Sequence, residues 1–203
     1  MTFLNVVFFA TAIVQQHGTP YQLNQEANAL LAQGRNAEAL VMARAAAHEA
    51  EATFGSHHPA TAMMIRNLAV AHERNGSYLL AEAEARRSLA ILESAFGPND
   101  VSLVPALNVL AEAYAGEGQL NEALRTALRS VEIGPDAEVH YGTALHDAGA
   151  ILELQGRLVE AGQYYRKALA VRQAALPAGH SFTDNTRASL QRVEHAAQLA
   201  LSK

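Results

Sequence analysis

The chain contains no cysteine and no tryptophan among its 203 residues. Without cysteine it has no disulfide bonds, no thiolate nucleophile and no metal site with cysteine ligands. Basic residues are also in the minority, because 15 lysines and arginines face 20 aspartates and glutamates and the formal net charge is −5. This balance gives no basic surface of the kind that binds nucleic acid, so no nucleic-acid partner is expected.

The sequence also has no apolar run of about 20 residues, which is the length that a membrane-spanning helix needs. The longest run, Phe3 to Val14, is interrupted by Asn5 and Thr11. Residues 1–16 allow two interpretations. The first is a signal peptide with a small-residue cleavage site at Ala10-Thr11-Ala12, which would make the protein periplasmic or secreted. The second is a helix that docks on the following repeats of a cytoplasmic protein, since no lysine or arginine precedes the run.

Catalytic and metal-binding motifs are absent from the sequence. Nine histidines occur, but none has the His-Glu-x-x-His spacing of a zinc site. Gly116-Glu117-Gly118 begins like a dinucleotide-binding fingerprint, yet Asn121 stands where a third glycine is required. No nucleophile elbow, phosphate loop or kinase signature is found. We therefore expect a protein that is not an enzyme and has no cofactor and no bound metal.

What the chain does contain is a glycine period. Gly34, Gly76 and Gly118 are 42 residues apart, and Gly156 follows after a further 38. Each glycine is followed at the fifth position by an alanine, namely Ala39, Ala81, Ala123 and Ala161. A fixed period of this length is typical of a repeat array in which one supersecondary unit stacks on its copies.

Alignment on the glycines shows what one unit contains. Large aliphatic residues stand eleven positions before the glycine and small residues stand seven before it, so both lie on one face of a helix that ends at the glycine. A second apolar face follows the glycine, and each unit is predicted to be helix, tight turn, helix. The aligned residues are Leu23, Ile65, Leu107 and Leu145 at the first position, and Ala27, Ala69, Ala111 and Gly149 at the second.

Proline and capping residues set the expected helix ends. The third unit is shortened, because Gly134-Pro135 stops its second helix early. The final helix carries Gln191, Glu194 and Gln198 among its apolar positions, which favours a capping helix with a polar outer side. The predicted helices span residues 20–33, 36–53, 59–75, 78–95, 100–117, 120–133, 137–155, 158–175 and 182–201.

These units resemble tetratricopeptide repeats. The small residues Ala69 and Ala111, the aromatic Tyr114, the turn glycine and the pair Ser88-Leu89 match that family, and Phe96-Gly97-Pro98 resembles its kinesin-light-chain subgroup. The resemblance implies an all-α fold, a right-handed α-solenoid of about four helix-turn-helix repeats in residues 17–180, with a capping helix at 181–203. The repeats would span about 20–56, 57–98, 99–135 and 136–178. Glu26, in place of the usual leucine, marks the first repeat as degenerate.

The resemblance also implies a function. First helices of such repeats line a concave groove, so we expect a non-catalytic protein-interaction scaffold that binds a partner peptide or helix. The alternative is a structural module that self-associates or belongs to a larger complex and captures no peptide. The family's lysine-rich carboxylate clamp is absent. The candidate groove residues are Asn24, Asn28, Met63, Arg66, Glu73, Asn108, Glu112, His146 and Glu153.

Overall fold

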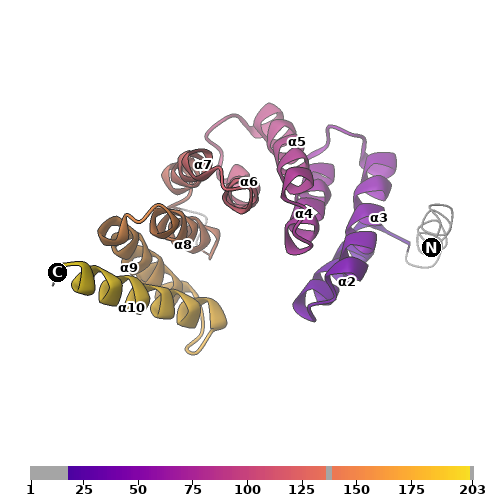
Figure 1. The fold of residues 1–203 in the computed structure, drawn as a ribbon. Helices are drawn as coiled ribbons and strands as arrows, with labels where there is room; N and C mark the ends of the chain where they lie inside the picture. The colour runs from indigo at the N-terminus through magenta and orange to yellow at the C-terminus, as the bar shows by residue number, and fades with distance from the viewer. Residues whose placement is uncertain (1–17, 136–138, 202–203) are drawn as a thin grey trace. The chain divides into compact units, whose positions relative to one another are not determined.

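The computed structural model describes residues 18–135 and 139–201, and every regular element in these ranges is helical (Figure 1). The predicted N-terminal segment 1–16 lies outside the described residues. The all-α class predicted from the sequence is confirmed. The elements are α2 (Pro20–Ala32), α3 (Asn36–Phe54), α4 (Pro59–Arg74), α5 (Tyr78–Phe96), the 3-10 turn η1 (Val101–Leu103), α6 (Val104–Gly116), α7 (Leu120–Ile133), α8 (Val139–Leu154), α9 (Leu158–Ala175) and α10 (Ser181–Leu201).

The helices form two compact units that divide after Gly97. The first unit contains α2 to α5 and the second contains α6 to α10. Within each unit consecutive helices pack on one another, and the first helices of neighbouring repeats also touch, α2 with α4 and α6 with α8. Each unit is therefore a stack of helix pairs, the arrangement of an α-solenoid.

The four periodic glycines occupy the turns inside the helix pairs. Gly34, Gly76, Gly118 and Gly156 have φ between 72° and 77°. This is the left-handed region, which glycine adopts without a clash from a side chain and which commonly ends a helix. The turn role predicted from the 42-residue period is confirmed.

Small residues sit where the paired helices cross. The alanines five positions after the turn glycines have no exposed surface, and the alanines seven positions before three of them are also buried. Short side chains let two helix backbones approach closely. The first set is Ala39, Ala81, Ala123 and Ala161, and the second is Ala27, Ala69 and Ala111.

The fourth repeat replaces this alanine packing with a matched pair. Tyr165, nine positions after its turn glycine, is 1% exposed, whereas alanines occupy that position in the other repeats (Ala43, Ala85 and Ala127). A Cβ added at Gly149 would lie 2.9 Å from Cδ1 of Tyr165. The absence of a side chain at Gly149 therefore leaves the space that the Tyr165 ring occupies.

Helix starts follow the predicted signals, with one difference. Thr19 forms a capping box with Gln22 at the start of α2, and Nδ1 of His58 accepts a hydrogen bond from the backbone N–H of Ala60 at 3.1 Å. The helix predicted at 100–117 begins instead as the 3-10 turn η1, and the α-helix starts only at Val104. Pro105 explains the difference, since it has no N–H to bond a carbonyl one turn earlier.

The last helix repeats the start of α4 but not its packing face. His180 accepts a hydrogen bond from the N–H of Phe182 at 3.2 Å, just as His58 accepts one from Ala60 at the start of α4. Equivalent positions of the two helices are therefore 122 residues apart in the chain. At that offset Gln191 is exposed where Ala69 is buried. The buried residues Ala62, Ile65 and Ala69 of α4 thus correspond to exposed polar residues of α10, namely Asp184, Arg187 and Gln191.

Candidate partner-binding face

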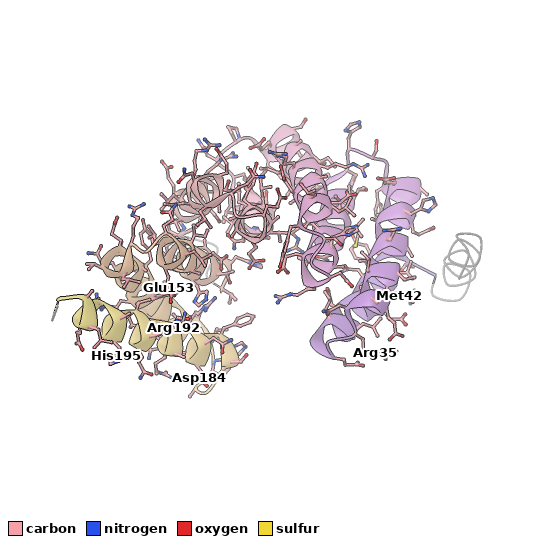
Figure 2. The ribbon with its side chains drawn as sticks, in the orientation of Figure 1. Arg35, Met42, Glu153, Asp184, Arg192 and His195 are labelled. Atoms are coloured by element: carbon pink, nitrogen blue, oxygen red, sulfur yellow. The ribbon has the colours of Figure 1, made fainter. Side chains whose placement is uncertain are left out.

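The predicted contact residues lie on the first helices of the repeats. Asn24 and Asn28 are on α2, Met63, Arg66 and Glu73 on α4, Asn108 and Glu112 on α6, and His146 and Glu153 on α8. Figure 2 shows the side chains, with Glu153 and Arg192 labelled.

Asn108 is part of the interior of the second unit. Its side chain is 5% exposed. The amide nitrogen donates to the carbonyl of His140 at 3.1 Å, and Oδ1 accepts from the hydroxyl of Ser130 at 2.6 Å. Both ends of the amide thus connect α6 to its neighbours, and neither is presented to a ligand. Glu112, one turn later, is half-buried.

Glu153 is held by two partners from other helices. Arg192 of α10 donates to both carboxylate oxygens, at 2.7 and 2.9 Å, and the hydroxyl of Tyr165 of α9 donates at 2.9 Å. The hydrogen bonds from Arg192 lower the pKa of Glu153, while burial raises the pKa of Tyr165. The carboxylate therefore fastens α8 to α9 and α10.

His146 is half-buried among the same helices. Its Nδ1 lies 3.2 Å from the hydroxyl of Thr186 on α10, and its ring packs 5.1 Å from the ring of Tyr165 at 54°. Burial, together with the nearby positive charges of Arg172 and Arg192, lowers the pKa of His146 to about 4. Neutral His146 is thus the form that fits this contact at pH 7.

In the first unit, two of the candidates also have partners. Oδ1 of Asn24 accepts a hydrogen bond from Asn67, which links α2 to α4. Glu73 forms an ion pair with the adjacent Arg74, with Nε and Oε2 3.3 Å apart. Asn28 is exposed and Met63 is half-buried.

Arg66 differs from every other candidate. Its side chain is half-buried on α4, and burial lowers the pKa of the guanidinium. Within residues 18–135 and 139–201 it makes no hydrogen bond and no ion pair. A partly desolvated cation without an anion is less well compensated than the paired charges of the other candidates.

The sequence interpretation missed a buried polar cluster in the second unit. Arg172 is 5% exposed and donates to the carbonyl of Phe182 at 3.0 Å and to Thr186. It stands sixteen positions after its turn glycine, where the first two repeats have Ala50 and Leu92. The charge in that core position was the signal that could have revealed the cluster.

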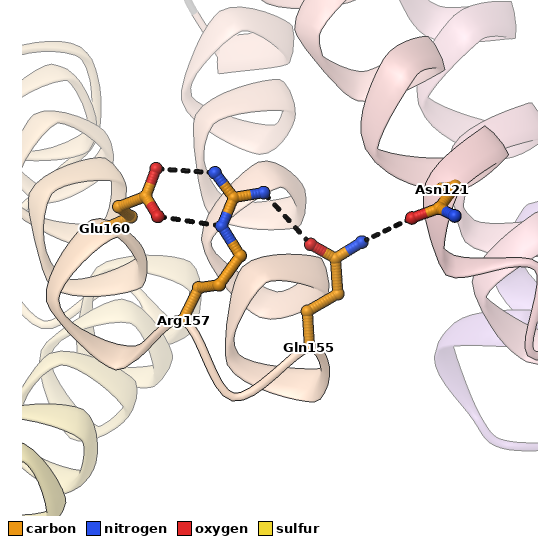
Figure 3. Close-up of polar contacts among 4 residues, drawn as sticks. All are labelled: Asn121, Gln155, Arg157 and Glu160. Carbon is orange, nitrogen blue, oxygen red and sulfur yellow. Dashed lines mark hydrogen bonds and ion pairs between the residues drawn. The ribbon is translucent and has the colours of Figure 1, made fainter.

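Polar side chains also brace the turn edges of the repeats. In the fourth repeat, Arg157 donates to both oxygens of Glu160 at 2.7 and 2.6 Å and to Gln155 at 3.2 Å (Figure 3). Gln155 in turn donates to Asn121 of the preceding repeat at 3.3 Å. The first repeat has the same pattern, with Arg35 donating to Glu38. These contacts support the turns.

Neither a cluster of metal-ligating side chains nor a membrane-spanning helix is found in the described ranges. No group of three or more histidine, aspartate or glutamate side chains there could hold a metal ion. No helix in these ranges is both long and apolar enough to cross a membrane.

The helix pairs match profiles of a known repeat family. Two family profiles, each described as "Tetratricopeptide repeat", match residues 61–136 in one case and residues 22–60 and 142–181 in the other. Together the matches cover most of the chain. A comparison with curated protein sequences gave no significant match.

Solved structures share the fold at low sequence identity. A putative kinesin light chain from Podosopora anserina with TPR-like repeats is 20% identical with a TM-score of 0.68, and 91% of each chain is covered. BtubC (BKLC) from P. vanneervenii is 18% identical with a TM-score of 0.68, over 96% of this chain and 81% of that one. The apo form of RapI is 18% identical with a TM-score of 0.69, over 88% of this chain and 64% of the other.

Proposed function

Because the chain belongs to the tetratricopeptide repeat family, we propose that it is a non-catalytic scaffold that holds a peptide segment of a partner protein. The family fold is that of a protein-interaction scaffold, and the finer proposal concerns where the peptide is held. We assign it to the face of the first unit formed by α2 and α4. The predicted contact residues of the second unit are mostly committed to its own packing.

A single observation carries this assignment, the half-buried guanidinium of Arg66 without a partner in the described ranges. Arginine presents several N–H donors in a planar fork that matches a carboxylate, so an acidic side chain or a chain terminus would satisfy it. Asn28 is exposed on the neighbouring helix and offers both a donor and an acceptor to a peptide backbone. Met63, one turn before Arg66, adds an adaptable apolar contact.

The test uses a displayed library of random twelve-residue peptides and the full chain. Peptides selected by the wild-type protein are expected to carry a carboxylate that aligns across the selected set. Arg66→Ala should weaken their binding by about tenfold to a hundredfold, as expected for loss of a charge-assisted hydrogen bond worth roughly 1.5–3 kcal/mol. Arg86→Ala is the matched control, because Arg86 is an exposed arginine on α5 in an ion pair with Glu82.

Two results would contradict the proposal. One is equal binding of the selected peptides by the wild type and Arg66→Ala. The other is a library that yields no binder while sedimentation shows a concentration-dependent oligomer. That second result would favour the alternative function, a self-associating structural module that captures no peptide.

A further inference from the structure

The contact between α8 and α10 joins the last helix to the array through groups whose charges depend on pH. Thr186 of α10 has no exposed surface. Its hydroxyl donates to the carbonyl of Phe182 at 2.9 Å and accepts from Arg172, and it lies 3.2 Å from Nδ1 of His146. One buried hydroxyl thus ties α8, α9 and α10 together.

The surroundings of His146 contain more positive than negative charge. Arg172 approaches from α9 and Arg192 from α10, while Glu153 on α8 is the one carboxylate acting on the imidazole. The ring of Tyr165 on α9 packs against the imidazole in a tilted arrangement. Helices α6 and α7 also pack on α8, and they contribute none of the charges that act on His146.

A proton on His146 would therefore be poorly tolerated while α10 is docked. The ring is partly withdrawn from water, and the added charge would face two guanidinium groups. If α10 moved away, it would take Arg192 and Thr186 with it and would expose the imidazole to water. The undocked form is thus the form that accepts the proton.

We propose that the α8–α10 contact is a proton-operated latch, in which protonation of His146 releases α10 and exposes the inner positions His146 and Glu153 of α8. Release would also uncover apolar groups at the α9–α10 contact, including Val193, which is 1% exposed. The end of the array would then offer a new surface in an acidic environment.

The expected size of the effect follows from linkage. His146 has a pKa of about 4 when docked, against 6.5 for the free side chain, so the undocked form binds more protons between these two values. The ratio of undocked to docked protein should rise as pH falls through this window, by about 20-fold between pH 7.0 and pH 5.0. Glu153 acts at lower pH, because its pKa lies below its ordinary value.

A single introduced thiol can measure this ratio, since the chain has no cysteine. Ser189 is 9% exposed on α10, and in Ser189→Cys the thiol reacts with a disulfide reagent only when α10 opens. The reaction rate, divided by that of an unstructured peptide thiol at the same pH, gives the opening ratio. Ser130→Cys, at a position with no exposed surface on α7, reports whether the whole second unit unfolds instead.

The comparison is made in three backgrounds. With His146 present, the opening ratio at Ser189→Cys should rise about 20-fold from pH 7.0 to pH 5.0 while Ser130→Cys stays protected. His146→Phe keeps a ring against Tyr165 and should remove the rise, with His146→Gln as a second variant if the first fails to fold. His195→Phe changes an exposed histidine on α10 and should keep the rise.

The latch is overturned by a flat opening ratio in the wild-type background. It is equally overturned if the rise persists in the His146 variant that folds, or if Ser130→Cys becomes reactive in parallel with Ser189→Cys.

Discussion

At the scale of the residue, the histidine in the core of the second repeat is the clearest exception to its surroundings. His72 is 4% exposed, and its Nδ1 is buried without a hydrogen-bond partner in the described ranges. Leu30 and Leu152 stand at the same position of the first and fourth repeats. Burial, with a smaller contribution from Arg44, lowers the pKa of His72. An apolar side chain suits this position better than an unpaired imidazole nitrogen.

We expect His72→Leu to stabilise the protein. The gain should be about 1 kcal/mol at pH 7, since the variant removes a buried nitrogen that has no partner. The gain should grow below pH 6.5, because the unfolded wild type then binds a proton that the folded form disfavours, and this binding lowers its free energy of unfolding. Urea unfolding at pH 7 and pH 5 measures both values.

His48→Leu is the control for this prediction. His48 is exposed on α3, so its replacement should change stability little at either pH. A His72→Leu variant less stable than the wild type at both pH values would show that the imidazole has a partner that the contacts above do not reveal.

At the scale of the element, the packing of α8 on α9 depends on the pair Gly149 and Tyr165. Adding a methyl group at residue 149 drives it into the ring, since the added Cβ would lie within 3.0 Å of two ring carbons. The other repeats solve the same crossing with two alanines, such as Ala69 and Ala85. Both pairs, two alanines or a glycine with a tyrosine, pack closely, but an alanine at residue 149 does not fit beside the Tyr165 ring.

Gly149→Ala should therefore cost about 1–3 kcal/mol by overpacking. Tyr165→Ala alone should cost about 3–5 kcal/mol because it leaves a cavity. The double variant should lose less stability than the two single variants lose in sum. A double-mutant cycle in urea measures this coupling. Gly162→Ala on α9 is the control, because the nearest atom to its added Cβ is 3.8 Å away and no clash results.

Element ends were predictable from the sequence, whereas cross-helix polar contacts were not. Proline, glycine and capping residues act within a few positions of the chain, and they place the observed ends of α2 to α5 within about two residues of the predicted ones. Asn108 shows the opposite case. Its position on the helix suggested an accessible amide, but its partners Ser130 and His140 stand 22 and 32 positions further along the chain.

The difference between local signals and contacts across helices also explains which candidate contact residues have partners. Helical periodicity predicts which residues share a face, but not which of them are already bound by another helix. Arg192 reaches Glu153 across 39 positions, and Thr186 reaches His146 across 40. Arg66 was predicted along with the others, and only the structure shows that its guanidinium has no partner among the described residues.

At the scale of the whole molecule, the two units should respond separately to local damage. Stability in a repeat array is a sum of repeat terms and nearest-neighbour terms, so a change in one helix pair acts mainly on its neighbours. Most contacts of α2 to α5 are made inside the first unit.

Ala81→Leu tests this expectation. Ala81 has no exposed surface, so the larger side chain should destabilise the first unit by about 1–3 kcal/mol. Amide hydrogen exchange should then speed up in α2 to α5, with α7 to α10 close to wild type. Ala83→Leu, at an exposed position on the same helix, should change neither. Equal acceleration along the whole chain would contradict the division into two units.

The replacement of two alanines by the pair Gly149 and Tyr165 also has a consequence for how the sequence evolves. Neither change is harmless alone, so a lineage that acquired one is under pressure to acquire the other soon afterwards. Among related chains, the two positions should be inherited together, as a small residue with an alanine or as a glycine with a ring. A pairing of alanine with tyrosine at these positions should be rare, and where it occurs, the helices around it should have shifted.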